Sequence, residues 1–481
     1  MDIVESLRRV LPAEAVIADR ESLRAYECDG LSAYRQVPHV VVLPDTAEQV
    51  QTILKLCHNL RVPVVARGAG TGLSGGAMPH AQGVLLSLAR FNRILRIDPL
   101  NRTATVQPGV RNLAISEAVG SCGLYYAPDP SSQIACTVGG NVAENSGGVH
   151  CLKYGLTVHN VLRLKALTID GEWLEAGSTA LDAPGYDLLA LLTGSEGMLA
   201  VIMEITVRLL PIPTYAQVAL AAFADVEDAC RAVAGIIAEG IVPAGLEMMD
   251  KLAIQAAEDF VHAGYPTDAE AMLLCELDGV PEEVAEQLAR MREVLERHGA
   301  KEVRVAVDEE ERKRFWAGRK AAFPAIGRLA PDYYCMDGTI PRKQLAFVLK
   351  RMAELSEKYG LPVANVFHAG DGNLHPLILY DANKPEELQK AERFGGDILE
   401  LCVAVGGTVT GEHGVGVEKL NQMCVQFGTA ELAQFYAVKE AFDPRGVLNP
   451  GKAVPTLARC AEYGAMHVHG GKLPFPDLPR F

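Results

Sequence analysis

A glycine-rich loop at 67–76 sets the strongest limit on how this chain can fold. It carries a G-x-G-x-x-G pattern that begins at Gly70, and it follows a predicted strand at 62–66. The dinucleotide fingerprint of the Rossmann fold requires a helix directly after this pattern. Here Pro79 comes next, followed by a second predicted strand at 84–88. The sequence therefore excludes a Rossmann unit at this loop.

Two further segments, 128–148 and 193–197, are rich in Gly, Ser and Asn. Glycine has no Cβ, so the backbone N–H groups of such loops can crowd around a phosphate. An irregular stretch as long as 128–148 is usually functional. A flexible surface turn is the alternative for 67–76, but five glycines in nine residues exceed what a turn needs. The three loops together favour one large ligand with phosphate, ribitol and ring parts.

A second group of polar residues lies in the C-terminal half. His368 and His375 flank a predicted Asp-Gly turn, and Glu412 and His413 stand side by side further on. Two imidazoles and a carboxylate can hold Zn²⁺, Mn²⁺ or Fe²⁺ and leave positions open for a substrate. His413 would then be able to move a proton. The alternative is that the two histidines only fix the turn by hydrogen bonding; the four residues together favour the metal site.

Composition excludes several classes of protein. The net charge of −15 argues against nucleic-acid binding, which needs clustered Lys and Arg. The eleven cysteines contain no C-x-x-C pair, which argues against an iron–sulfur cluster, a zinc ribbon or a disulfide framework and favours reduced thiols in the cytoplasm. The first ten residues lack the apolar core of a signal peptide. No uncharged apolar run approaches the ~18 residues of a membrane span.

The pattern of strands and helices predicts an α+β fold. Pro211-Ile212-Pro213 marks a domain boundary. Beyond it, strand–helix–strand units at 218–249 and 272–307 suggest a ferredoxin-like or extended antiparallel sheet with helices on one face. Other predicted elements are a strand at 39–43, a helix to residue 60 opened by a capping box at 45–48, hairpins at 94–106 and 158–175, a strand at 200–210, and helices at 112–121, 309–323, 342–359, 386–405 and 430–442.

From Val37 to Val454 the sequence resembles a known family. Loops 67–76, 128–148 and 193–197 resemble the flavin-binding segments of the vanillyl-alcohol-oxidase superfamily, also called the PCMH-type FAD domain. The C-terminal half resembles FAD-linked 2-hydroxy-acid dehydrogenases, which include D-lactate and D-2-hydroxyglutarate dehydrogenases. With the FAD-linked D subunits of bacterial glycolate oxidases the likeness extends into the tail, 459–469.

This resemblance implies a domain plan. We expect a helical lead-in at 1–35, a two-lobed PCMH-type FAD-binding domain at 36–213, and a ferredoxin-like cap or substrate domain with the metal-type turn at 214–410. A C-terminal helical segment at 411–455 would return to the FAD domain, and an extended tail would occupy 456–481.

The resemblance also implies the residues that hold FAD. No His or Cys lies within 67–76, so the covalent tether that some relatives form there is not possible, and we expect dissociable FAD. The cofactor-binding residues implied are Arg67, Gly68, Ala69, Gly70, Thr71, Gly72, Leu73, Ser74, Gly75, Pro128, Asp129, Ser131, Ser132, Gly139, Asn141, Ser146, Glu196, Ile202 and Asn449.

The implied activity is FAD-dependent oxidation of glycolate, and of D-lactate, to the 2-oxo acid. His368, His375 and Glu412 would bind the metal, and His413 would take the hydroxyl proton. Arg319 is the candidate for binding the substrate carboxylate, because a guanidinium matches a carboxylate in two places. The alternative is a surface helix arginine.

Implied partners are a second FAD-type subunit and an iron–sulfur subunit. The complex would lie in the cytoplasm, peripheral at the inner membrane. Three other functions remain open: a stand-alone D-lactate or D-2-hydroxyglutarate dehydrogenase, a flavin-free metallohydrolase that uses the histidines, and a non-catalytic scaffold subunit.

Overall fold

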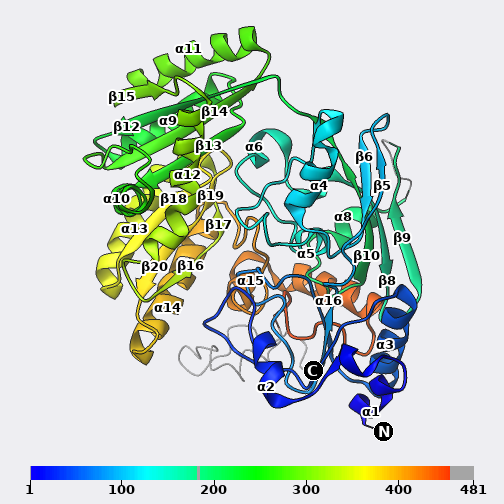
Figure 1. The fold of residues 1–481 in the computed structure, drawn as a ribbon. Coiled ribbons are helices and arrows are strands. Elements are labelled where there is room, and N and C mark those ends of the chain that lie inside the picture. The colour runs from blue at the N-terminus through cyan, green and yellow to red at the C-terminus, as the bar shows by residue number, and fades with distance from the viewer. Residues whose placement is uncertain (1, 181–184, 456–481) are drawn as a thin grey trace. The chain divides into compact units, whose positions relative to one another are not determined.

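The computed structural model describes residues 2–180 and 185–455, and the chain groups into two compact units (Figure 1). Unit 1 comprises Met1–Gly147, Leu156–Ile212 and the chain from Glu412, and unit 2 comprises Gly148–Gly155 and Pro213–Gly411. Both units combine helices with sheets, which confirms the predicted α+β class. The short segment 148–155 falls inside the range 36–213, yet it groups with unit 2. The predicted tail at 456–481 lies outside the described residues.

A small sheet with the strand order β1-β2-β4-β3 begins unit 1. Strands β2, β4 and β3 are parallel and β1 pairs antiparallel with β2, so the segment 1–35, expected as a helical lead-in, contains a short strand besides its helices. Thr46 caps the N-terminus of helix α3 and exchanges side-chain and backbone hydrogen bonds with Gln49. The capping box is therefore one residue later than 45–48. The elements are β1 (Val16–Ile17), β2 (Val40–Val42), β3 (Val64–Arg67), β4 (Val84–Ser87), α1 (Ile3–Arg8), α2 (Arg20–Leu23) and α3 (Ala47–Leu60).

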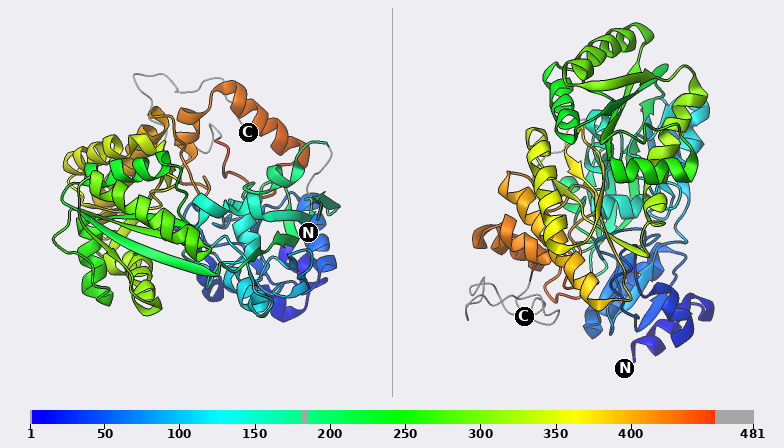
Figure 2. Two further views of the ribbon diagram at one scale, coloured as in Figure 1. Left: turned by 90° about the horizontal axis from the view of Figure 1, so that it is seen from above. Right: turned by 90° about the vertical axis from the view of Figure 1, so that its left-hand side faces the viewer.

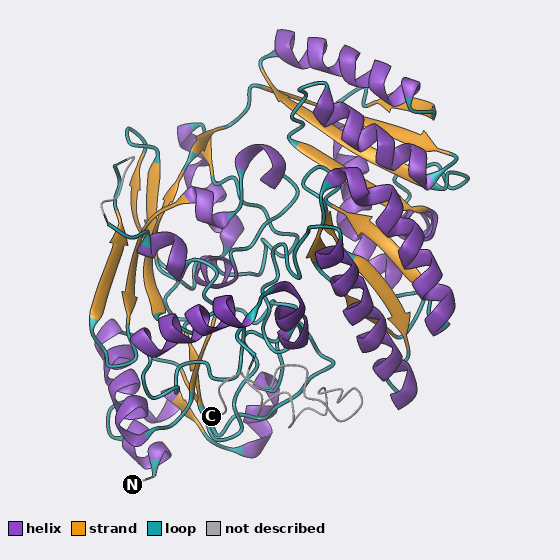
Figure 3. Ribbon diagram, turned by 180° about the vertical axis from the view of Figure 1, so that it is seen from behind, coloured by secondary structure: helices purple, strands orange, loops and turns teal. Residues whose placement is uncertain are grey.

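The second sheet of unit 1 is antiparallel, with the order β5-β6-β10-β8-β9. Figure 3 draws its strands as orange arrows. Both predicted hairpins are present; Gly171, at φ +79°, makes the turn of the second one. The elements are β5 (Ile94–Asp98), β6 (Thr103–Val106), β7 (Leu124–Tyr125), β8 (Val161–Leu167), β9 (Trp173–Gly177), β10 (Val201–Arg208), β11 (Leu210–Pro211), α4 (Asn112–Val119), α7 (Thr157–Asn160), α8 (Leu188–Leu192), α15 (Leu420–Gln426) and α16 (Thr429–Phe442).

The segment 128–148, expected to be irregular, contains helix α5 (Val138–Glu144). Two adjacent glycines give this helix a poor intrinsic propensity, so its sequence hides it. Burial of Val138 and Val142 in the core beside the antiparallel sheet stabilises it instead. Asn145 ends the helix in the left-handed conformation, at φ 55°.

Unit 2 is built on a seven-stranded sheet with the order β15-β12-β14-β13-β18-β20-β16. Its first four strands have the ferredoxin-like order, and three more extend the sheet. The elements are β12 (Tyr215–Phe223), β13 (Gly245–Asp250), β14 (Ala271–Gly279), β15 (Ala300–Val305), β16 (Asp332–Cys335), β17 (Gly338–Thr339), β18 (Val363–Phe367), β19 (Asn373–Leu374), β20 (Pro376–Tyr380), α6 (Cys151–Tyr154), α9 (Val226–Ala238), α10 (Lys251–Val261), α11 (Pro281–Arg297), α12 (Glu309–Ile326), α13 (Leu345–Tyr359) and α14 (Pro385–Ala404).

Helices cover both faces of this sheet, so the expectation of helices on one face is wrong (Figures 1 and 2). Helices α10 and α12 pack on the face that carries Val218 and Leu220, whereas α9 and α11 contact β12 and β14 from the other side. The reason lies in β12, whose residues 218–223 are all buried. A strand that is apolar on both faces needs cover on both faces. None of the helices in the described residues has the length and apolar character needed to cross a bilayer.

Candidate active site

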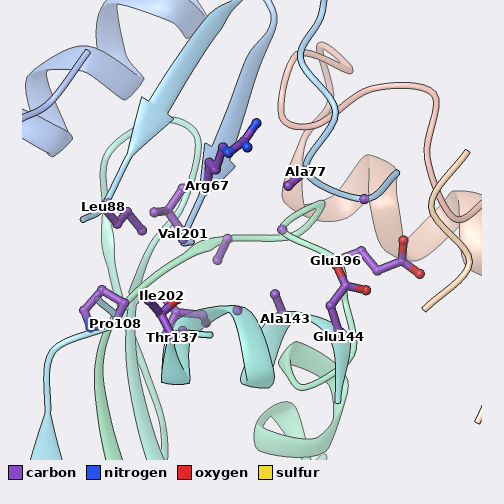
Figure 4. A pocket seen from close by; sticks show the side chains of 17 residues that line it. Arg67, Ala77, Leu88, Pro108, Thr137, Ala143, Glu144, Glu196, Val201 and Ile202 are labelled. Atoms are coloured by element: carbon purple, nitrogen blue, oxygen red, sulfur yellow. The ribbon is translucent and has the colours of Figure 1, made fainter. Parts of the chain in front are cut away.

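Unit 1 contains a cavity of about 70 Å³, partly open to solvent, beside the end of β3 (Figure 4). Strand β3 brings Arg67 to the cavity, helix α5 supplies one wall, and the loop before β10 supplies another. The cavity is lined by Ala66, Arg67, Gly68, Gly76, Ala77, Leu88, Pro108, Thr137, Gly139, Gly140, Ala143, Glu144, Glu196, Gly197, Ala200, Val201 and Ile202.

All three glycine-rich segments contribute to this lining. Of the cofactor residues implied by resemblance, the lining includes Arg67, Gly68, Gly139, Glu196 and Ile202. The others lie outside it: Ala69, Gly70, Thr71, Gly72, Leu73, Ser74, Gly75, Pro128, Asp129, Ser131, Ser132, Asn141, Ser146 and Asn449. Residues Thr137 and Glu144 line the cavity but were not among those predicted.

The walls suit a ligand that hydrogen-bonds to the backbone at close range. The Thr137 hydroxyl is buried and has no protein partner. A Cβ on Gly139 would lie 2.5 Å from Pro108 Cβ and 2.9 Å from its carbonyl oxygen, so only glycine fits there. A Cβ on Gly68 would collide with the Thr137 hydroxyl. These residues fit a large cofactor with hydrogen-bonding groups, as FAD is.

Two carboxylates lie at one end of the cavity (Figure 4). Glu196 accepts hydrogen bonds of 2.7 Å from the backbone N–H groups of Val415 and Gly416. Burial raises the pKa of Glu196, although these N–H groups oppose the shift. Burial and the nearby Glu196 carboxylate together raise the pKa of Glu144 well above its ordinary value. The cavity therefore holds a carboxyl group that tends to keep its proton.

Residues near the C-terminal end of unit 1 hydrogen-bond to the backbone of the glycine-rich loops. Lys452 Nζ donates to the carbonyls of Gly76 at 3.0 Å and Met78 at 2.8 Å. Asn449 Nδ2 donates to the carbonyls of Gly76 and Glu196. Asn449, implied as a cofactor residue, thus holds two loops together.

Unit 2 buries an acid–base cluster between its sheet and α12. Glu247 Oε1 lies 2.8 Å from His368 Nδ1, and Glu247 Oε2 accepts a hydrogen bond of 2.8 Å from Arg319 Nε. Burial alone would raise the pKa of Glu247, but His368 and Arg319 outweigh it and hold this pKa below its ordinary value. Arg319 is buried, so the alternative of a surface arginine is wrong.

The structure brings His368 and His375 together. Their rings meet edge to face with centroids 5.0 Å apart, and their ligand nitrogens lie within 4.8 Å of each other. His375 Nε2 lies 3.6 Å from an oxygen of Asp337, which is fully buried. The other Asp337 oxygen accepts hydrogen bonds from the Thr410 hydroxyl and the Gly411 N–H. Two imidazoles beside carboxylates suit a divalent metal ion.

Glu412 and His413 follow Gly411 in the chain and belong to unit 1. Their membership of the metal site, and the role of His413 as a base, stay predictions. Glu247 and Asp337 were missed as site residues. Glu247 could have been found, because it interrupts the apolar residues Leu246, Met248 and Met249 of strand β13.

Comparison with known proteins agrees with this division. Residues 38–177 match the family model "FAD binding domain", and residues 212–453 match "FAD linked oxidases, C-terminal domain". The chain is 65% identical to the glycolate oxidase subunit GlcD of Escherichia coli over 100% of its length and 96% of that protein. It is 38% identical to GlcD of Bacillus subtilis, over 95% and 98%.

Two further similar proteins share less of the sequence with this chain. A D-lactate dehydrogenase of Archaeoglobus fulgidus is 36% identical over 87% of this chain and 92% of that protein. Among solved structures, p-cresol methylhydroxylase has a TM-score of 0.80 at 17% identity, covering 95% of this chain and 97% of that one. At that identity the likeness shows the fold alone.

Proposed function

The chain belongs to the FAD-linked oxidases, and we propose that it oxidises glycolate, and D-lactate less well, to the corresponding 2-oxo acid. The identity of 65% to the E. coli GlcD protein over the whole chain carries this proposal. The enzyme class, an FAD-linked 2-hydroxy-acid oxidoreductase, follows from the family and from the cavity that fits its cofactor.

In this proposal, FAD binds in unit 1 to Arg67, Gly68, Thr137 and Gly139. A divalent metal ion binds to His368, His375 and Glu412. When bound, FAD accepts a hydride and the metal acts as a Lewis acid that makes the substrate hydroxyl easier to deprotonate. His413 accepts that proton.

Arg319 orients the substrate carboxylate in this proposal. Its Nε and one terminal nitrogen already face Glu247, so the opposite edge of the guanidinium is the part left for the substrate. Met336 lies just before Asp337 and packs against Gly395 in α14. Met336 is uncharged, so it cannot bind a second carboxylate, and this favours a small monocarboxylate over a larger diacid.

We also propose that reduced flavin passes its electrons to an iron–sulfur subunit, in a complex that includes a second FAD-type subunit and lies peripherally at the inner membrane. The E. coli and B. subtilis relatives are both named as subunits of glycolate oxidase, which supports a multisubunit assembly. Co-purification of an affinity-tagged chain, followed by iron analysis, tests this part.

An absorption spectrum tests the catalytic proposal. The purified protein is mixed anaerobically with glycolate, D-lactate or D-2-hydroxyglutarate, and bleaching of the flavin band is followed with time. We expect the fastest bleaching with glycolate. Preference for D-lactate or D-2-hydroxyglutarate would favour the stand-alone dehydrogenase, supported by the A. fulgidus relative. A colourless protein would revive the metallohydrolase, and a yellow protein inert to every acid would favour the scaffold.

A further inference from the structure

A single carboxylate, Glu247, connects two groups that the proposed function uses separately. It lies on β13, on the sheet face that α12 covers, and the exposed fraction of its side chain is 1%. Arg319 reaches it from α12, and His368 reaches it from the end of β18. Burying a carboxylate this deeply costs free energy unless both of its oxygens accept hydrogen bonds, so its partners indicate its role.

The two carboxylate oxygens of Glu247 contact different partners. Oε2 faces Arg319, at 2.8 Å from Nε and 2.6 Å from Nη2. Oε1 faces His368 Nδ1 at 2.8 Å. An ionised carboxylate can only accept, so this contact requires a proton on Nδ1 and places the ring's lone pair on Nε2. Pairing of this kind fixes the orientation of a metal-binding histidine and raises its basicity.

We propose that Glu247 is a positioning residue that sets the Nε2 nitrogen of His368 toward the metal ion and holds Arg319 at the same time. This inference rests on the proposed metal site of His368 and His375. It makes metal affinity and carboxylate binding depend on one side chain that touches neither the metal nor the substrate.

Glutamine at position 247 separates this role from simple space-filling. Its amide has nearly the shape of the carboxylate but offers one acceptor and one donor group. The guanidinium of Arg319 can only donate, so the amide oxygen faces Arg319 and the NH₂ group faces His368 Nδ1. His368 therefore loses its acceptor, and the lone pair of its ring moves from Nε2 to Nδ1.

The matched control is Glu276 on the neighbouring strand β14. It is also buried on the face that α12 covers, and it also accepts hydrogen bonds from an α12 arginine, Arg312, at 3.2 Å, and from Trp316. His150 lies 3.4 Å from its other oxygen. Glu276→Gln thus disturbs a similar network that contains none of the proposed metal ligands.

The experiment measures Zn²⁺ affinity of the full-length holoenzyme by competition with a chromogenic chelator. We expect Glu247→Gln to raise the Zn²⁺ dissociation constant by about 10- to 100-fold, the usual effect of losing such a partner. Glu276→Gln should change it less than twofold.

If Glu247→Gln does not fold, the double variant Glu247→Leu/Arg319→Met replaces both buried charges by apolar groups of similar size. It should show the same loss of Zn²⁺ affinity. Wild-type affinity in either folded variant would overturn this inference while leaving the proposed function intact. A wild-type protein that binds neither Zn²⁺, Mn²⁺ nor Fe²⁺ would overturn both this inference and the proposed metal site.

Discussion

Arg319 and Glu247 form an ion pair of 2.6 Å inside unit 2, and the exposed fractions of their side chains are 2% and 1%. Removing a charge from water is costly, so each partner is tolerated because the other is present. This pair therefore limits which substitutions at Arg319 give interpretable kinetics. A loss of activity has to be separated from a loss of folding.

Arg319→Met should destabilise the protein by about 3–5 kcal/mol, because it leaves the Glu247 charge in the interior with only His368 beside it. Urea unfolding followed by circular dichroism measures this loss. Arg292→Ala is the control, since Arg292 pairs with Glu296 on the exposed face of α11, where such pairs contribute about 0–1 kcal/mol. Similar losses in the two variants would contradict the structural role of the buried pair.

Gly139→Ala should weaken FAD binding, because the new methyl group would meet the backbone of Pro108 at 2.9 Å and displace α5 from the cavity wall. Overpacking at a rigid position typically costs about 1–3 kcal/mol, so we expect an FAD dissociation constant raised about 5- to 150-fold. Quenching of flavin fluorescence on titration of the apoprotein measures it. Gly120→Ala, which meets no atom within 4 Å, is the control; unchanged affinity in Gly139→Ala would place the cofactor elsewhere.

Lys452→Met should release FAD more readily and lower the melting temperature. The Lys452 ammonium group caps the carbonyls of Gly76 and Met78, and a thioether cannot replace these hydrogen bonds. Differential scanning fluorimetry with and without added FAD gives both effects. Lys301→Met, on an exposed position of β15, should change neither. A Lys452 variant that keeps its flavin through gel filtration would show that the loops hold their shape without this brace.

The acid-precipitation test addresses how FAD is held. We expect the flavin in the supernatant, because neither the 67–76 loop nor the lining of the cavity contains a His or Cys that could form a tether. Absorbance of the supernatant and the washed pellet at the flavin band measures the distribution. Yellow colour that stays in the pellet would contradict a dissociable cofactor.

Local sequence signals predicted most of the fold. The Asp170-Gly171 hairpin is present because its turn needs a left-handed residue, and glycine supplies it. The strand–helix–strand units of unit 2 follow from apolar strands separated by an amphipathic helix. Helix α5 was not visible in the sequence, since tertiary burial of Val138 and Val142 overrides the low propensity of its glycines.

Contacts between residues far apart in sequence were the part that could not be predicted. Residues 148–155 group with unit 2 because Lys153 and Tyr154 bond to Asp278, more than 120 positions away. No local pattern encodes such a pairing. In the same way, His368 was identified from its motif, but the carboxylate that holds it, Glu247, lies 121 positions earlier.

The stability of unit 2 should depend on pH through Asp250. Burial raises the pKa of this carboxyl group to about 6, although hydrogen bonds from Ala253 and Asn365 oppose the shift. The folded protein then keeps a proton that the unfolded chain has released, so this group's contribution to stability falls as pH rises from about 4 to about 6 and is constant above.

Asp250→Asn removes the ionisation. The free energy of unfolding of the wild type minus that of the variant should therefore decrease across this window, as measured by urea unfolding at half-unit pH steps. Asp19→Asn is the control: Asp19 also caps a helix, but the Ser22 N–H lowers its pKa, so the change in its effect on stability falls below its ordinary pKa and the difference should stay nearly constant from pH 4 to 6. A wild-type–variant difference for Asp250 that is flat between pH 4 and 6 would show that its carboxyl group has an ordinary pKa.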